Sequence, residues 1–141
     1  MTQHQINLVK SSWQAAASKS VLVGEFFYSR LFELAPETKD LFGVTVLQQS
    51  NKLAVMLSYI INKLDKLDDI IDEVAKLARQ HVSYGVTPEH YALGGGIFLW
   101  SLEKVFGDSW NEELKDAWET CYITLTDAMI QAADYSRQDA A

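Results

Sequence analysis

Three side chains in this sequence could do chemistry, because each places a polar group on an otherwise apolar helical face. They are Tyr28, Gln49 and His81. His81 lies in a stripe of apolar residues at helical spacing, formed by Leu67, Ile70, Ile71, Val74, Leu77, Ala78 and Val82. An inward histidine of this kind is more often a hydrogen-bonded core residue than a metal ligand. The helix of His81 alone leaves both readings open.

The other two polar residues point to a shared pocket. Tyr28 lies in an aromatic helix predicted from about Ser20 to Leu34, and Gln49 shares a helical face with Leu53. Three inward polar groups on three helices are typical of one binding pocket. A large flat cofactor would explain the arrangement, with an imidazole binding its metal on one face. An amide and a phenol would then bind a small ligand on the other face.

The elements that position these residues are all predicted to be helices, and we expect seven, counting a short one after Pro36 that ends near Phe42. Residues 44–50 form a weakly patterned connection that enters the helix of Gln49. Capping boxes are expected at Thr2 and Ser109, Gly85 ends the helix of His81, and Thr87-Pro88 begins the next one. A polar C-terminal tail begins at about residue 136.

Two glycine positions indicate close packing. Gly24 lies inside a predicted helix, where glycine costs about 1 kcal/mol relative to alanine, so a close helix crossing is expected there. The run Gly94-Gly95-Gly96 is equally poor for helix stability and suggests that backbone or a ligand comes close.

Composition excludes several classes of protein. The 141 residues, 48% of them hydrophobic, are enough for a single domain over residues 1–141. A net charge of −7 disfavours nucleic acid and anionic membranes as partners, and no apolar run is long enough to span a membrane. The lone Cys121 and the lack of a secretory signal predict a cytoplasmic protein. Zinc-site, phosphate-loop and serine-nucleophile motifs are absent from the sequence.

Several segments together resemble the globins. The run from Phe27 to Phe32, followed by Pro36 and Leu41-Phe42, is similar to the second globin helix, its proline and its haem-stacking phenylalanine. The stretch from Leu77 to Val86 resembles the globin proximal segment. His90-Tyr91 and Ala117-Trp118 resemble bacterial single-domain globins related to the haem domain of flavohaemoglobins. The likeness extends in order from about Gln5 to Tyr135.

This resemblance implies an all-α globin fold, a single domain of about seven helices that sandwich one haem b (iron protoporphyrin IX). On the distal side it implies that Tyr28 and Gln49 contact the gas ligand and that Leu53 covers the ligand site. Phe42 is expected to pack on the haem. Lys52 is expected either to pair with a haem propionate or to be a solvated lysine.

On the proximal side the resemblance implies that His81 binds the iron and that Leu77 and Val86 pack beside it. Tyr91 is similar to a flavohaemoglobin tyrosine that orients the histidine. The family pairs that tyrosine with a glutamate, but this sequence has Ala133 at the aligned position and Asp134 beside it. The flavin-binding and nicotinamide-binding domains of flavohaemoglobins are not in this sequence, so repeated redox turnover would need a separate reductase.

The function implied is reversible binding of dioxygen, and of other diatomic gases, for storage, delivery or sensing. The alternative is a nitric oxide dioxygenase that uses an external reductase, so whether the protein is an enzyme stays open. A helical bundle that transfers phosphoryl groups through His81 is disfavoured, because such a histidine should be exposed. A globin-like signalling domain without haem is disfavoured by the polar residues at Tyr28 and Gln49.

Overall fold

Helices account for nearly all of the structure, a computed structural model that describes residues 1–42 and 45–140, with side chains up to residue 132. The described elements are α1 (Gln3–Ala15), η1 (Ala17–Lys19), α2 (Ser20–Leu34), η2 (Pro36–Leu41), α3 (Val46–Asn62), η3 (Leu64–Ile70), α4 (Ile71–Ser83), α5 (Pro88–Phe106), η4 (Gly107–Ser109) and α6 (Glu112–Ala140). The η segments are short 3-10 helices. Six α-helices and η2 correspond to the seven predicted helices, so the all-α prediction is confirmed.

The helix starts follow the capping residues, with two corrections. The predicted box at Thr2 is present, since its hydroxyl accepts from the Gln5 backbone N–H at 3.1 Å. A second box, Thr45 with Gln48, starts α3 at Val46, so the prediction of a connection through residue 50 was wrong. The box predicted at Ser109 was also wrong. The Asn111 side chain accepts from the Leu114 N–H at 2.8 Å instead, directly before α6.

The largest core cluster lies where α1, α5 and α6 meet. The ring of Trp118 on α6 is fully buried there and packs against the rings of Trp13 and Phe98. Its indole N–H donates to Ser12 Oγ at 3.0 Å, so the one polar atom of this side chain is satisfied. Aromatic area of this size is the main source of stability in a small helical domain.

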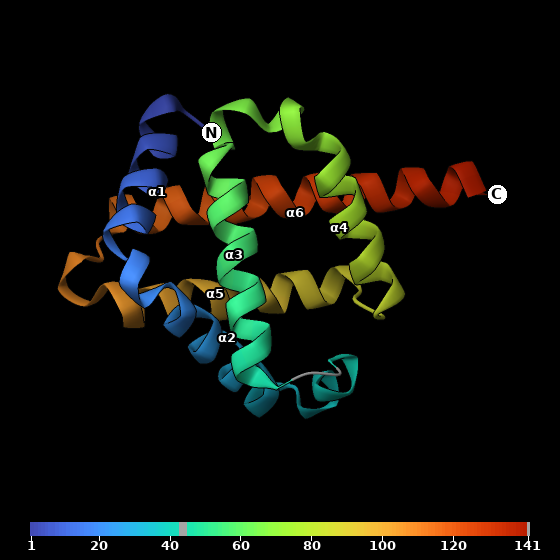
Figure 1. The fold of residues 1–141 in the computed structure, drawn as a ribbon, viewed down its shortest axis with the longest axis horizontal. Coiled ribbons are helices and arrows are strands. Elements are labelled where there is room, and N and C mark those ends of the chain that lie inside the picture. The colour runs from blue at the N-terminus through green and yellow to red at the C-terminus, as the bar shows by residue number, and fades with distance from the viewer. Residues whose placement is uncertain (43–44, 141) are drawn as a thin grey trace.

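The remaining helices are arranged around this core as Figure 1 shows. The antiparallel helices α5 and α6 run along the long axis, and α2 packs against both α3 and α5. The segment η3 leads from α3 to α4, and α4 packs against α6. The main partner of α3 is α2, and Ile60 near the end of α3 shares a buried cluster with Val74 and Ala78 of α4. No helix among these residues is long and apolar enough to cross a membrane.

Gly24 marks a close helix crossing, between α2 and α3. A Cβ added at this glycine would lie 2.7 Å from the Cα of Ser50, closer than real Cβ atoms approach backbone. The predicted close crossing is therefore confirmed. Tyr28 follows Gly24 by about one turn and Gln49 precedes Ser50, so the crossing sets the distance between these two side chains.

Candidate functional site

The distal pair predicted from the sequence meets in the structure. The Gln49 side-chain Nε2 donates to the Tyr28 hydroxyl oxygen at 3.4 Å, and Tyr28 is 5% exposed. Burial raises the pKa of the Tyr28 hydroxyl, an effect larger than the opposing one of the Gln49 hydrogen bond. The phenol therefore stays protonated at neutral pH. Because its oxygen accepts from Gln49, its own proton is available to a further acceptor.

Aromatic rings hold the Tyr28 side chain in place. The ring of Phe42, just after η2, lies edge-on to that of Tyr28 with centroids 5.3 Å apart, and Phe32 packs on both. Leu53, one turn after Gln49 on α3, belongs to the same apolar cluster. Tyr28, Gln49, Phe42 and Leu53 thus form one contiguous group, which we call the α2–α3 group.

His81 has a defined protonation pattern. Its Nδ1 lies 2.8 Å from the backbone oxygen of Leu77, one turn earlier in α4. A carbonyl oxygen only accepts hydrogen bonds, so Nδ1 carries the proton in the neutral ring and the Nε2 lone pair is free. The side chain is half-buried, and among the described residues no hydrogen-bond partner is found for Nε2. This is the state that a metal-binding imidazole requires.

The end of α4 fixes the position of His81. The Val86 N–H donates to the His81 backbone oxygen at 3.0 Å, and the Gly85 N–H donates to that of Val82 at 3.0 Å. This pattern is the Schellman motif, which needs a left-handed residue, and Gly85 has a φ of 88°. The glycine predicted to end the helix does so within one turn of His81. The half-buried side chains of Leu77 and Val86 flank His81 along the chain.

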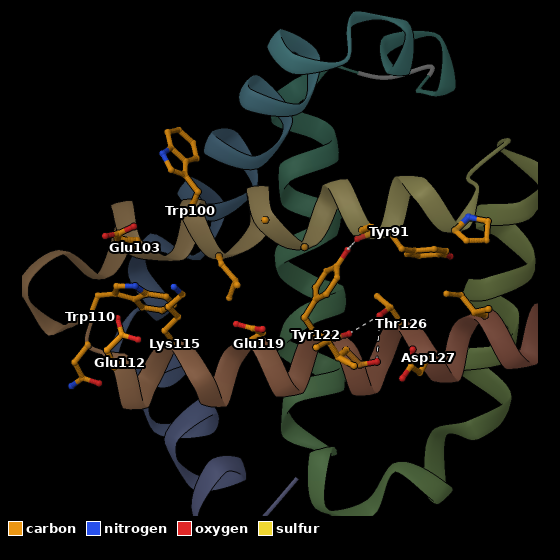
Figure 2. Close-up of a pocket in the computed structure, with 18 residues that line it drawn as sticks. Tyr91, Trp100, Glu103, Trp110, Glu112, Lys115, Glu119, Tyr122, Thr126 and Asp127 are labelled. Atoms are coloured by element: carbon orange, nitrogen blue, oxygen red, sulfur yellow. Dashed lines mark hydrogen bonds between the residues drawn. The ribbon is translucent and has the colours of Figure 1, made fainter.

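Tyr91 connects His81 to α5 and α6. Its ring is nearly parallel to the imidazole of His81, at an angle of 24° and a centroid distance of 6.1 Å. Its backbone oxygen accepts a hydrogen bond of 2.7 Å from the Tyr122 hydroxyl, drawn in Figure 2. We call His81, Leu77, Val86 and Tyr91 the α4–α5 group.

Sequence reasoning missed Tyr122. A Cβ at Gly94 or Gly95 would lie 2.9 Å from an atom of the Tyr122 side chain, so these glycines make room for a side chain rather than for backbone or a ligand. The signal was the glycine pair itself. The sequence does not show which residue of another helix fills the space.

The two groups approach each other at the end of η2. The Leu41 side chain, next to Phe42, lies 3.5 Å from where a Cβ on Gly85 would stand. No interaction among the described residues joins His81 to Tyr28 or Gln49, so a pocket shared by all three stays a prediction. Lys52 is exposed on α3, three residues after Gln49. Ala133 and Asp134, at the position of the family's glutamate, lie outside the residues whose side chains are described.

Known proteins resemble this chain along most of its length. The family model described as Globin matches residues 25–129. A flavohemoprotein of Vibrio cholerae is 29% identical over 133 residues, which are 92% of this chain and 34% of that protein. The chain thus spans about a third of the length of the flavohemoproteins that it matches.

Two solved structures have the same fold. One is an engineered carbene transferase made from a Rhodothermus marinus protein assigned as a nitric oxide dioxygenase. It is 25% identical with a TM-score of 0.88, covering 100% of this chain and 99% of that one. The other is a bacterial globin from Campylobacter jejuni, 24% identical with a TM-score of 0.87, covering 97% and 99%. The family model spans most of the chain, and the chain belongs to the globin family, whose fold binds haem.

Proposed function

We propose that this protein binds haem b through His81 and uses it to bind dioxygen reversibly. The observation that carries the proposal is the hydrogen bond of His81 Nδ1 to the Leu77 oxygen, which leaves Nε2 free for an iron ion. Haem, when bound, supplies an iron centre at which dioxygen and other diatomic gases bind. The residues of this chain then decide how the haem is held and how the gas ligand is stabilised.

The described residues suit a flat apolar group. Met56 and Leu53 share the stripe of Gln49 on α3, and Met56 is 36% exposed while Leu53 is only partly buried. Leu77, one turn before His81, is also partly exposed. Partly exposed apolar side chains on α3, and on α4 one turn from a free imidazole, are what a porphyrin-binding site would need. We propose that Lys52, which is exposed on α3, pairs with a haem propionate.

Tyr28 and Gln49 would act on the gas ligand rather than on the iron. A dioxygen that gains negative charge is stabilised by hydrogen-bond donors in a site with little water. The Tyr28 hydroxyl proton is free to donate, and the Gln49 amide both holds the phenol oxygen and retains a second N–H. This arrangement supports tight dioxygen binding with slow release.

The proposal is tested by titrating the purified protein with haem and recording absorption spectra of its ferric, ferrous and carbon-monoxide-bound forms. We expect an intense haem band in the wild type that is lost or strongly altered in His81→Ala and restored by added imidazole. His4→Ala is the matched control, because His4 is exposed and lies on α1. A colourless wild type that takes up no haem would overturn the proposal. Identical haem spectra for His81→Ala and His4→Ala would also overturn it.

A nitric oxide dioxygenase is the second candidate. It is favoured by the full-length likeness to the Rhodothermus marinus protein assigned to that activity, and by the flavohemoprotein relatives. Conversion of nitric oxide and dioxygen to nitrate consumes one electron per turnover, so the chain would need an electron-donating reductase. That partner and a cytoplasmic location stay predictions. Sustained consumption of nitric oxide with an added reductase would support this candidate, and loss of activity after one turnover would favour gas binding or sensing.

A further inference from the structure

A groove of about 990 Å³ runs between α5 and α6. Its lining extends on α5 from Pro88 to Glu103, which at 1.5 Å per residue is a length of about 22 Å. Figure 2 shows Trp100, Trp110 and Lys115 toward one end and Thr126 and Asp127 toward the other. The length of the groove corresponds to about four turns of an α-helix.

The floor of the groove is made by missing side chains. Gly96 lines it, and a Cβ added there would meet nothing within 4 Å. Gly95 also lines the groove, and there the ring of Tyr122 occupies the space of the missing side chain. Apolar side chains continue the surface on both helices, among them Leu99 and Ile123, and Ile123 is 48% exposed. A helix packs closely where its neighbour presents small residues flanked by larger apolar ones.

The edges of the groove are acidic. Four carboxylates line the groove: Glu112, Glu119 and Asp127 on α6, and Glu103 on α5. The lining contains one basic residue, Lys115. Within the part of the chain that the structure describes, none of these four carboxylates has an ion-pair partner. Unpaired carboxylates along a partly apolar groove favour a ligand that is apolar on one face and positively charged on its edges.

Two further basic side chains lie at the Trp100 end of the groove. Arg30 and Lys104 both lie over the ring of Trp100, at 5.4 Å and 5.5 Å from its centroid. Arg30 is already paired with Glu33 at 2.8 Å. Glu103 and Glu112 lie at this same end, so acidic side chains are present along the whole length of the groove.

We propose that this groove binds an amphipathic, positively charged α-helix of a partner protein, on the order of 15 residues long. A second copy of this chain is a poor occupant, since two identical acidic grooves repel each other. The surface of an anionic membrane is repelled for the same reason, and a membrane is not shaped to enter a groove between two helices. The proposal goes beyond haem binding and does not depend on it.

The groove also reaches the candidate site. Tyr91 lines the groove at the end near Pro88 and stacks on His81, and Tyr122, which donates to the Tyr91 oxygen, lines it as well. One side chain therefore separates a helix lying in the groove from the imidazole of His81. A partner docked there would contact Tyr91, the side chain that packs on the imidazole.

The test measures binding of a fluorescently labelled helical peptide of leucine and lysine, about 16 residues long with leucine on one face. The full-length protein is used, with and without haem, and the readout is peptide anisotropy together with tryptophan emission, since Trp100 and Trp110 line the groove. We expect saturable binding that weakens as salt is raised. A peptide with glutamate in place of lysine, and one with the same composition but no apolar face, should not bind.

Two variants locate the binding site. Gly96→Leu fills the floor, and Glu119→Lys with Asp127→Lys reverses the charge of the edge, so each should weaken binding by about tenfold or more. The matched controls are Ala15→Leu, exposed on α1, and Asp68→Lys with Asp69→Lys, exposed in η3 with the same change in net charge. These should bind within about twofold of the wild type.

Several outcomes would overturn the proposal. Equal weakening by both double charge reversals would mean that the peptide binds the acidic surface in general. Equal binding of the glutamate peptide, or no saturable binding of the lysine peptide, would also reject it. Self-association of the wild type that is lost in Gly96→Leu would assign the groove to a second copy. Failure of haem uptake with intact peptide binding would reject only the proposed function.

Discussion

The Tyr28 hydroxyl oxygen already accepts one hydrogen bond. Gln49 donates to its oxygen at 3.4 Å, and burial keeps the phenol neutral by raising its pKa. The hydroxyl proton therefore has to point toward another acceptor, and in a haem-loaded protein the gas ligand is the proposed one. At His81 the proton is the group already used, because Nδ1–H donates to the Leu77 oxygen. The lone pair on Nε2 is the group that stays available.

Replacing Tyr28 tests this assignment directly. Tyr28→Phe keeps the ring that packs on Phe42 but removes the donor, a loss of about 1–2 kcal/mol that corresponds to roughly 5- to 30-fold faster dioxygen release. Stopped-flow displacement of dioxygen by carbon monoxide measures this rate. Tyr84→Phe is the matched control, because Tyr84 is 55% exposed. An unchanged rate in Tyr28→Phe would remove the phenol from the ligand site.

The sequence predicted part of this site for a physical reason. Tyr28 and Gln49 are polar groups on apolar helical faces, and such groups need hydrogen-bond partners. In the structure these two side chains are hydrogen-bonded to each other. The Tyr122 hydroxyl was not predicted, because its partner is the Tyr91 backbone oxygen. Every residue has such an oxygen, so the pattern of side chains does not indicate which one is used.

Among the elements, helix ends were predictable where a local side chain or glycine specifies them. Thr2 and Gly85 act within four residues of the chain, and both predictions are confirmed. The capping box of Thr45 follows the same rule. The sequence did not predict it, because the residues around Thr45 show only weak apolar periodicity. The crossing of α2 and α3 was indicated by Gly24, but its partner Ser50 depends on tertiary packing.

Two glycine-to-alanine substitutions distinguish the effect of the close α2–α3 crossing from that of helix propensity. Gly24→Ala would put a Cβ 2.7 Å from the Ser50 Cα, so we expect the free energy of unfolding to fall by about 1–3 kcal/mol. The Tyr28 and Gln49 side chains should also move apart. Gly96→Ala meets nothing within 4 Å and should raise the free energy of unfolding by about 0.5–1 kcal/mol through helix propensity.

Urea denaturation of both variants measures these changes, with the wild type as reference. The contrast is informative because both are the same substitution in the interior of an α-helix, with opposite expected signs. Equal effects of Gly24→Ala and Gly96→Ala would show that the α2–α3 crossing is looser than the structure has it.

In the whole molecule, the main core and the candidate site occupy different apolar clusters. The largest cluster surrounds Trp118, whereas Tyr28 and Leu77 belong to two smaller ones. Substitutions such as His81→Ala therefore leave the largest core intact, so loss of haem binding can be separated from loss of folding. The separation also explains why helical periodicity predicted the fold well. The core depends on that periodicity, whereas the site depends on how the helices meet.

One buried thiol and two buried phenol hydroxyls are expected to make the stability of this fold depend on pH in the alkaline range. Cys121 is 2% exposed within the largest cluster, and burial raises the pKa of its thiol from an ordinary value near 9 to about 12. Burial also raises the pKa values of the Tyr28 and Tyr122 hydroxyls. Each of these groups is neutral when protonated, so burial favours the form that carries the proton.

We therefore expect the free energy of unfolding to fall above pH 9. Below that pH both the folded and the unfolded chain keep the Cys121 proton, whereas above it the unfolded chain releases the proton first. Stability then decreases by up to about 1.4 kcal/mol per pH unit from this group alone, until the pH reaches about 12.

Urea denaturation at about pH 8 and about pH 10 measures the decrease, and Cys121→Ala should show a smaller one. The same dependence on pH in the wild type and in Cys121→Ala would contradict the assignment. Alkylation of the thiol should likewise require unfolding of the largest core.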